Sequence, residues 1–86
     1  MFYVYLLKSE RDGSLYVGYT NDLKRRFEEH NQRRNRSTKH KAPFRLVYYE
    51  AYSHKRDAKE RESQLKRHAG AMTHLKRRNR NGLLLS

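Results

Sequence analysis

The side chains of this sequence that could carry out chemistry are one carboxylate, two phenols, a guanidinium and an imidazole. The carboxylate is Glu62, which follows Ala58 and precedes Leu65 at helical spacing and so falls on an inward helix face. Glu60 points about 160° away, toward solvent. A carboxylate in an apolar stripe is costly unless it is paired or holds a cation. An ion pair with Arg26 or another cation is one interpretation of Glu62, and a divalent metal ligand is the other.

The two phenols belong to a predicted β-hairpin at the start of the chain. The runs FYVYLL, from position 2, and LYVGY, from position 15, are rich in aromatic and β-branched residues and flank Asp12-Gly13. Asp-Gly favours a two-residue type I′ loop, because Gly accepts the positive φ that this loop requires. Such a loop pairs Arg11 with Ser14.

This register puts Tyr5 and Tyr16 on one face of the sheet, together with Tyr3 and Gly18. A slip of one residue would separate the two phenols onto opposite faces. The alternative interpretation is that these tyrosines are ordinary strand aromatics, which β-sheets favour for packing.

The guanidinium and the imidazole fall on a predicted helix after the hairpin. Thr20 or Asn21 is expected to cap its N-terminus. The inward face of this helix is expected to consist of three residues at positions i, i+4 and i+7, namely Leu23, Phe27 and His30. Arg26 lies four residues before His30 and therefore on the same side of the helix. A snorkelling surface arginine beside a half-buried histidine is the alternative interpretation.

The second half of the chain predicts a strand and two more helices. Pro43 precedes a third strand over 44–52, since proline is excluded from central strand interiors. Ser53 is expected to cap a helix that runs to about His68 and stops at Gly70, with Ala69 as the last member of its inward face. A short third helix is expected to pack its Met72 and Leu75 side onto the sheet.

The charge of the chain points to an anionic partner. Lys and Arg number 21 against 9 Asp and Glu, which gives a formal net charge of +12 over 86 residues. Nucleic acid is the leading partner, because neutralising its phosphates releases counterions. A membrane surface is not expected, because the basic stretches lack a bulky apolar face. The basic loop over 32–41 is either a phosphate contact or a solvated segment. The candidate nucleic-acid-binding residues are Arg33, Arg34, Arg36, Lys39, Lys41, Lys66, Arg67, Lys76, Arg77 and Arg78.

Length and composition predict a single domain over residues 1–86. The sequence contains no cysteine, which excludes disulfides and thiolate metal sites. It has no signal-peptide pattern and no run of membrane-spanning length, so the cytoplasm is the expected location.

Four motifs together resemble the GIY-YIG nuclease superfamily, and in particular its small stand-alone bacterial members. In chain order they are Tyr3-Val4-Tyr5, Tyr16-Val17-Gly18, Leu23-x-x-Arg26-x-x-x-His30 and Ala58-x-x-x-Glu62-x-x-x-Lys66. The likeness extends from Phe2 to about Lys66. Tyr3 stands where the family name has glycine.

The resemblance implies an α+β fold in which a three-stranded antiparallel sheet is flanked by helices in the order β-β-α-β-α-(α). It also implies metal-dependent hydrolysis of DNA phosphodiester bonds, with Mg²⁺ or Mn²⁺ as cofactor. The implied catalytic residues are Tyr5, Tyr16, Arg26, His30 and Glu62, with Glu62 as the metal ligand. Larger members use a downstream asparagine, for which Asn79 and Asn81 are the candidates here.

One carboxylate is sufficient for Mg²⁺ if water and substrate phosphate supply its other ligands. Tyr5 or Tyr16 would then remove the proton of an attacking water, with nearby positive charge from Arg26 and His30 favouring the phenolate. Structure-directed or weakly selective cutting is expected, or dependence on a protein partner for specificity. The alternative functions are a non-catalytic module that binds DNA or RNA and a small basic ribosome-associated protein. RNA stays an alternative partner because phosphate contacts do not distinguish the sugar.

Overall fold

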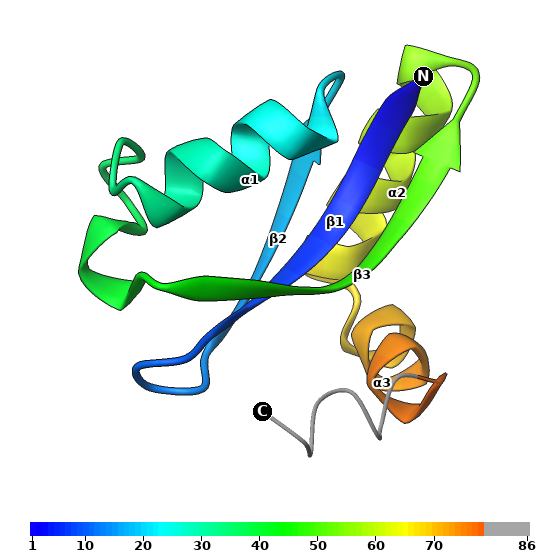
Figure 1. Ribbon diagram of the computed structural model, residues 1–86. Coiled ribbons are helices and arrows are strands. Elements are labelled where there is room, and N and C mark those ends of the chain that lie inside the picture. The colour runs from blue at the N-terminus through cyan, green and yellow to red at the C-terminus, as the bar shows by residue number, and fades with distance from the viewer. Residues whose placement is uncertain (79–86) are drawn as a thin grey trace.

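The computed structural model describes residues 1–78 and confirms the predicted α+β architecture (Figure 1). A three-stranded antiparallel sheet has the strand order β2-β1-β3. The elements in chain order are β1 (Phe2–Ser9), β2 (Leu15–Thr20), α1 (Leu23–Asn31), the 3-10 turn η1 (Lys39–Lys41), β3 (Phe44–Tyr52), α2 (Lys55–Arg67) and α3 (Ala69–Arg78). Asn79 and Asn81, the candidates for the downstream asparagine, lie outside the described residues.

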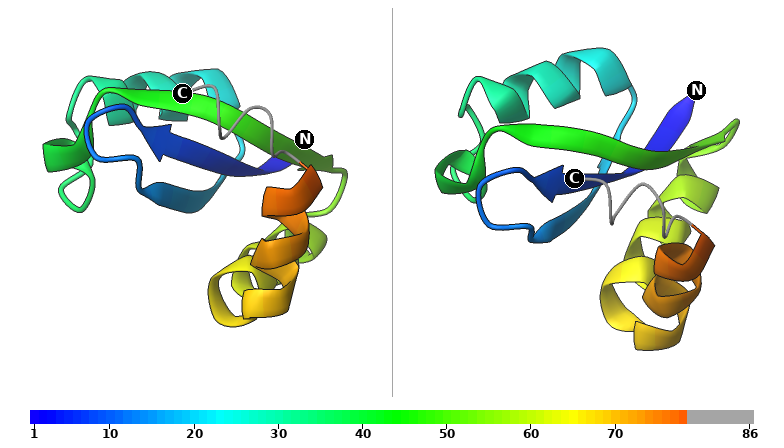
Figure 2. Two further views of the ribbon diagram at one scale, coloured as in Figure 1. Left: turned by 90° about the horizontal axis from the view of Figure 1, so that it is seen from below. Right: turned by 60° about the horizontal axis from the view of Figure 1, so that its bottom comes forward.

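Helices cover both faces of the sheet, so that the central strand β1 is buried on both sides (Figures 1 and 2). Residues alternate between faces along a strand. Val4 and Leu6 therefore face α2 and α3, whereas Tyr5 and Leu7 face α1. None of the helices within residues 1–78 is both long enough and apolar enough to span a membrane.

The predicted two-residue hairpin loop is wrong, because the loop has four residues between Ser9 and Ser14. The amide of Ser9 donates to the carbonyl of Ser14 (2.8 Å), and Gly13 N–H donates back to the Ser9 carbonyl (2.9 Å). The Ser9 hydroxyl accepts from the amides of Arg11 and Asp12, which stabilises the wider loop. The register consequently differs by two residues from the prediction, so every residue keeps its predicted face.

Helix α1 begins and ends with defined hydrogen bonds. Asp22 is the N-cap, in place of the predicted Thr20 or Asn21, and its Oδ1 accepts from the amide of Arg25 (3.2 Å). At the C-terminal end, Arg34 N–H donates to Glu29 O and Arg33 N–H donates to His30 O, which is a Schellman motif. Arg33 has φ 61°, a conformation usually left to glycine.

Strand β3 agrees with its predicted bounds and contains a bulge. Leu6 pairs with Tyr48 but Leu7 pairs with Leu46, so Val47 is an extra residue on β3. The bulge changes the alternation of faces. Leu46 and Tyr49 consequently face α1 together, although they are three residues apart.

Helix α2 packs against the face of the sheet opposite to α1. The carboxylate of Glu50 connects this helix to β3. Glu50 accepts hydrogen bonds from Tyr48 (2.8 Å) and Tyr52 (2.6 Å) and from two nitrogens of Arg61 (2.9 and 3.1 Å). Burial alone would raise the pKa of Glu50, but these hydrogen bonds outweigh it and hold the pKa below its usual value.

The predicted cap of α2 and its predicted stop residue are wrong, whereas its predicted end near His68 is confirmed. His54, without a side-chain cap, precedes the helix instead of Ser53. The helix ends before His68, whose extended backbone separates it from α3, and Gly70 lies inside α3. Ala69 therefore belongs to α3 and not to the inward face of α2. The prediction that Met72 and Leu75 pack inward is confirmed, because Leu75 is buried with Val4 and Leu6 and Met72 packs against this cluster.

Candidate active site

A buried chain of hydrogen bonds connects Tyr5, His30 and Thr38. The Tyr5 hydroxyl lies 3.0 Å from His30 Nε2, and His30 Nδ1 lies 2.9 Å from the Thr38 hydroxyl. A neutral imidazole has one donor and one acceptor nitrogen, so His30 donates to one of these hydroxyls and accepts from the other. The side chain of His30 is fully buried, and Thr38 therefore fixes the orientation of its ring.

Tyr16 completes a cluster of three rings on the α1 face of the sheet. Its ring centroid lies 5.0 Å from that of His30 and 6.3 Å from that of Tyr5. The sequence-based prediction that both phenols share one face is thus confirmed.

Gly18 provides the space for this cluster. Tyr5 pairs directly with Gly18 across the two strands. A Cβ atom at Gly18 would overlap the hydroxyl oxygen and two ring carbons of Tyr5. The phenol therefore lies over β2, an edge strand of the sheet, and directs its hydroxyl toward His30.

We expect Gly18→Ala to destabilise the fold by about 1–3 kcal/mol, the usual cost of overpacking. Displacing the phenol by about 1 Å should also reduce cleavage roughly 100-fold. Urea denaturation and a cleavage assay measure the two effects. Gly70→Ala is the matched control, because no atom beyond its chain neighbours and its own helix backbone lies within 4 Å of its Cβ position and alanine favours the helix. Equal behaviour of the two variants would contradict the role given to Gly18.

Burial keeps both Tyr5 and His30 uncharged. It raises the pKa of Tyr5 to about 12, although a hydrogen bond with Arg26 opposes the rise. Burial, together with the positive charge of Arg26, lowers the pKa of His30 to about 4. The expectation that His30 supplies positive charge is therefore not met, and its ring makes hydrogen bonds to Tyr5 and Thr38 instead.

The low pKa of His30 makes stability depend on pH. Between about pH 4 and pH 6.5 the unfolded state binds a proton at this residue and the folded state does not, so stability increases with pH in this window. We expect a loss of the order of 2–3 kcal/mol as the pH falls from about 6.5 to 4. Urea denaturation across this range should show a weaker pH dependence in His30→Gln. The same pH dependence in the variant would contradict this assignment.

Arg26 lies beside the phenols and is held by Glu29. Its Nη1 donates to Glu29 Oε1 at 3.2 Å. Partial burial alone would lower the pKa of Arg26, but hydrogen bonds to Tyr5 and Glu29 outweigh it and raise the pKa. The Arg26 side chain is about one-third exposed, so it remains accessible to an anionic ligand at the edge of the ring cluster.

Glu62 comes from α2, whose buried residues pack on the other face of the sheet. Its side chain is 16% exposed and is paired with Lys66 (3.1 Å) and, more distantly, Lys59 (3.9 Å). The cation that pairs with Glu62 is thus a lysine, since Arg26 is paired with Glu29. Glu62 lies close enough to Tyr5 for its negative charge to contribute to the raised pKa of the phenol.

The residues of the site fit a hard divalent cation that keeps most of its waters. Glu62 offers one largely buried carboxylate, and Mg²⁺ needs only one or two carboxylates when water and phosphate complete its octahedron. Within residues 1–78, His, Cys, Asp and Glu form no group of three or more that would enclose a metal. The donor set therefore matches a cation shared with a phosphate ligand.

The candidate nucleic-acid-binding residues are all exposed, and they form two separate groups. One group follows α1 and includes Arg33, Arg34, Arg36, Lys39 and Lys41. The other lies on α2 and α3 and includes Lys66, Arg67, Lys76, Arg77 and Arg78. The loop after α1 and helix α3 lie at opposite ends of the molecule (Figures 1 and 2).

Sequence reasoning missed two residues that support the site. Thr38 orients His30 from a loop without periodicity, and the sequence carries no signal for it. Asn31 binds both the amide and the carbonyl of Phe44, which joins the end of α1 to the start of β3. The sequence signal for this contact was the position of Asn31 directly after His30, at the end of the predicted helix.

A match to a family model identifies the family of the protein. Residues 1–81 match the family model described as the GIY-YIG catalytic domain. The chain therefore belongs to the GIY-YIG family, which is a family of endonucleases.

Relatives of known sequence are small proteins of the UPF0213 group. The UPF0213 protein CPE1444 of Clostridium perfringens is 43% identical over 68 residues, which cover 78% of this chain and 72% of that protein. A UPF0213 protein of Bacillus pumilus is 43% identical over 65 residues, covering 74% and 65% of the two chains. The solution NMR structure of the UPF0213 protein BH0048 from Bacillus halodurans is 37% identical, covers 98% of this chain and 83% of that chain, and has a TM-score of 0.48.

Proposed function

We propose that the protein is a single-domain, metal-dependent DNA endonuclease that hydrolyses phosphodiester bonds. The observation that carries this proposal is the cluster of Tyr5, Tyr16 and His30 beside Arg26, together with the largely buried carboxylate of Glu62, whose negative charge acts on Tyr5. A binding surface for DNA has no need of a carboxylate, which repels phosphate. A carboxylate beside a guanidinium and two phenols is instead suited to phosphoryl transfer.

Each residue has a distinct part in the proposed reaction. Glu62 would hold the divalent cation, which stabilises charge on the leaving 3′ oxygen when it is bound. Arg26 neutralises the charge that develops on the phosphoryl oxygens. Tyr5, with its pKa of about 12, keeps its proton and positions the site together with His30. Tyr16, in the same ring cluster, is the phenol that removes the proton of the attacking water.

The two basic groups bind the sugar-phosphate backbone in this proposal. Phosphate contacts fix orientation without reading sequence, so the chain is expected to be structure-directed or weakly selective, or to take specificity from a partner protein.

The second candidate is a non-catalytic nucleic-acid-binding module. The pairing of Glu62 with Lys59 and Lys66 favours it, because these lysines neutralise the carboxylate without a metal. Binding and cleavage can be separated by adding labelled DNA in EDTA and then supplying excess Mg²⁺. The nuclease proposal expects salt-sensitive binding in EDTA and shortened products after Mg²⁺. Unchanged DNA at every Mg²⁺ and Mn²⁺ concentration would support the binding module instead.

A further inference from the structure

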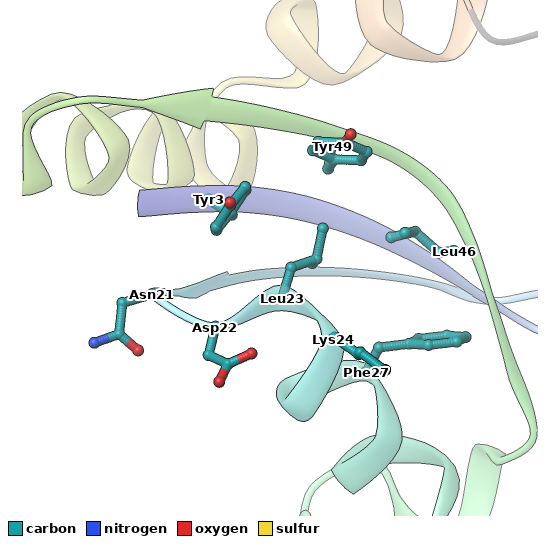
Figure 3. A pocket seen from close by; sticks show the side chains of 8 residues that line it. All are labelled: Tyr3, Asn21, Asp22, Leu23, Lys24, Phe27, Leu46 and Tyr49. Atoms are coloured by element: carbon teal, nitrogen blue, oxygen red, sulfur yellow. The ribbon is translucent and has the colours of Figure 1, made fainter. Parts of the chain in front are cut away.

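A pocket of about 480 Å³ lies outside the proposed catalytic cluster, between the N-terminal end of α1 and the β1–β3 part of the sheet (Figure 3). Its volume falls in the range of about 300–1,000 Å³ that small-molecule sites occupy. The sheet contributes two tyrosines and a leucine, and α1 contributes two apolar side chains and a lysine. The lining residues include Tyr3, Tyr49, Leu46, Phe27, Asp22 and Lys24.

The wall of this pocket is an aromatic surface that the fold leaves open. Tyr49 is 52% exposed and is one of two large hydrophobic residues within residues 1–78 with such exposure. Its ring packs edge to face against Tyr3, with centroids 6.1 Å apart. Figure 3 shows both rings on the sheet side of the pocket, with α1 on the other side. The bulge at Val47 places Leu46 and Tyr49 on this same face.

The polar groups of the pocket favour a base and disfavour a phosphate. The Asp22 carboxylate lines the pocket and repels anions. One of its oxygens accepts from the amide of Arg25, and a carboxylate has acceptor capacity for further donors such as an exocyclic amino group. Lys24, which lines the pocket, is an exposed cation that can hold a flanking phosphate.

The pocket shares a sheet face with the proposed catalytic residues. Tyr5 pairs with Gly18 on one side and with Tyr49 on the other, so the three residues form one row across the sheet. Adjacent strands are about 4.8 Å apart, which puts Tyr49 about 10 Å from Gly18. One DNA strand advances about 3.4 Å per nucleotide in a duplex, so the separation corresponds to a few nucleotides.

From these observations we infer that the Tyr3–Tyr49 pocket binds an unpaired nucleobase a few nucleotides from the bond that is cut. Aromatic side chains stack on any base, whereas a paired base in a duplex cannot enter a pocket. The formal charge of +12 makes a nucleic acid the complementary occupant. The inference rests on the proposed function, and it specifies the substrate as DNA with an unpaired nucleotide, such as a bulge, flap or single strand.

The test compares two labelled DNA duplexes in EDTA, one fully paired and one with a single bulged 2-aminopurine. The wild type should bind the bulged DNA more tightly and quench the 2-aminopurine fluorescence. Tyr49→Leu, which removes the ring but keeps an apolar side chain, should weaken binding of the bulged DNA roughly tenfold, the effect of losing one stacked base. Its affinity for the paired duplex should not change, and Tyr49→Phe should restore binding of the bulged DNA.

Arg36→Ala is the control for backbone contact and should weaken binding of both DNAs equally. An equal affinity of the wild type for the two DNAs, or an equal loss for both in Tyr49→Leu, would overturn the inference. Cleavage is measured separately after Mg²⁺ is added. Tyr49-dependent binding without cleavage would refute the nuclease and leave the pocket in place. Cleavage of DNA by a protein whose preference for bulged DNA does not depend on Tyr49 would support the nuclease and overturn the inference about the pocket.

Discussion

Replacing Glu62 with Gln is expected to reduce DNA cleavage by about 10²- to 10³-fold. Glutamine keeps the shape of the side chain but removes the charge that would hold a divalent cation, and the cation contributes several kcal/mol of transition-state stabilisation. DNA binding should persist in the variant or become tighter, because a negative charge near the phosphates is lost. Cleavage under single-turnover conditions and binding in EDTA measure the two effects separately.

Glu60→Gln is the matched control for this variant. Glu60 lies two residues away on the same helix, is 62% exposed and pairs with Arg56 at 3.5 Å. It points to solvent as the sequence predicts, so its replacement should leave cleavage near the wild-type rate. Full activity of Glu62→Gln, or an equal loss in both variants, would exclude the proposed role of Glu62.

Replacing Arg26 with Ala is expected to have the second large effect, a loss of about 10²- to 10³-fold in the rate of cleavage. A fixed donor aimed at developing charge contributes about this much when it is removed from an oxyanion site. Stability should change little, because the ion pair with Glu29 is partly exposed and such pairs contribute about 0–1 kcal/mol. Single-turnover rates and urea denaturation check both expectations.

Arg25→Ala controls for the loss of a positive charge on the same helix. Arg25 is exposed, whereas Arg26 is partly buried beside Tyr5. The control should weaken DNA binding slightly and leave the rate at saturating DNA unchanged. Equal rates for the two variants would show that Arg26 acts only as a general phosphate contact.

Strand alternation was sufficient to predict that Tyr5 and Tyr16 share a face, even though the loop length was wrong. An error of two residues preserves the face of every side chain, whereas an error of one would have reversed it. The loop itself depends on hydrogen bonds from the Ser9 hydroxyl, which the Asp-Gly pattern does not reveal.

Helical periodicity likewise predicted the inward positions of Glu62, Leu65 and His30, because spacing along one helix fixes the face. It could not predict which cation pairs with Glu62. Lys66, one turn along the same helix, competes with cations from other elements for the Glu62 carboxylate. It is the nearer partner, at position i+4.

Contacts between distant segments could not be predicted from the sequence. Thr38 reaches His30 from an irregular loop, and burial of His30 by the surrounding elements removes the positive charge that the sequence suggested. Tyr49 and Leu46 share a face only because β3 contains a bulge. Each of these features arises from the packing of two or more elements.

The most direct test of the central claim is cleavage of linear, branched and single-stranded DNA in Mg²⁺ or Mn²⁺ by the wild type, Glu62→Gln and Arg26→Ala. The proposed site predicts cutting by the wild type that requires the metal and is lost in both variants while DNA binding persists. Tight, salt-sensitive binding by the wild type with no cutting of any DNA in either metal would contradict the claim.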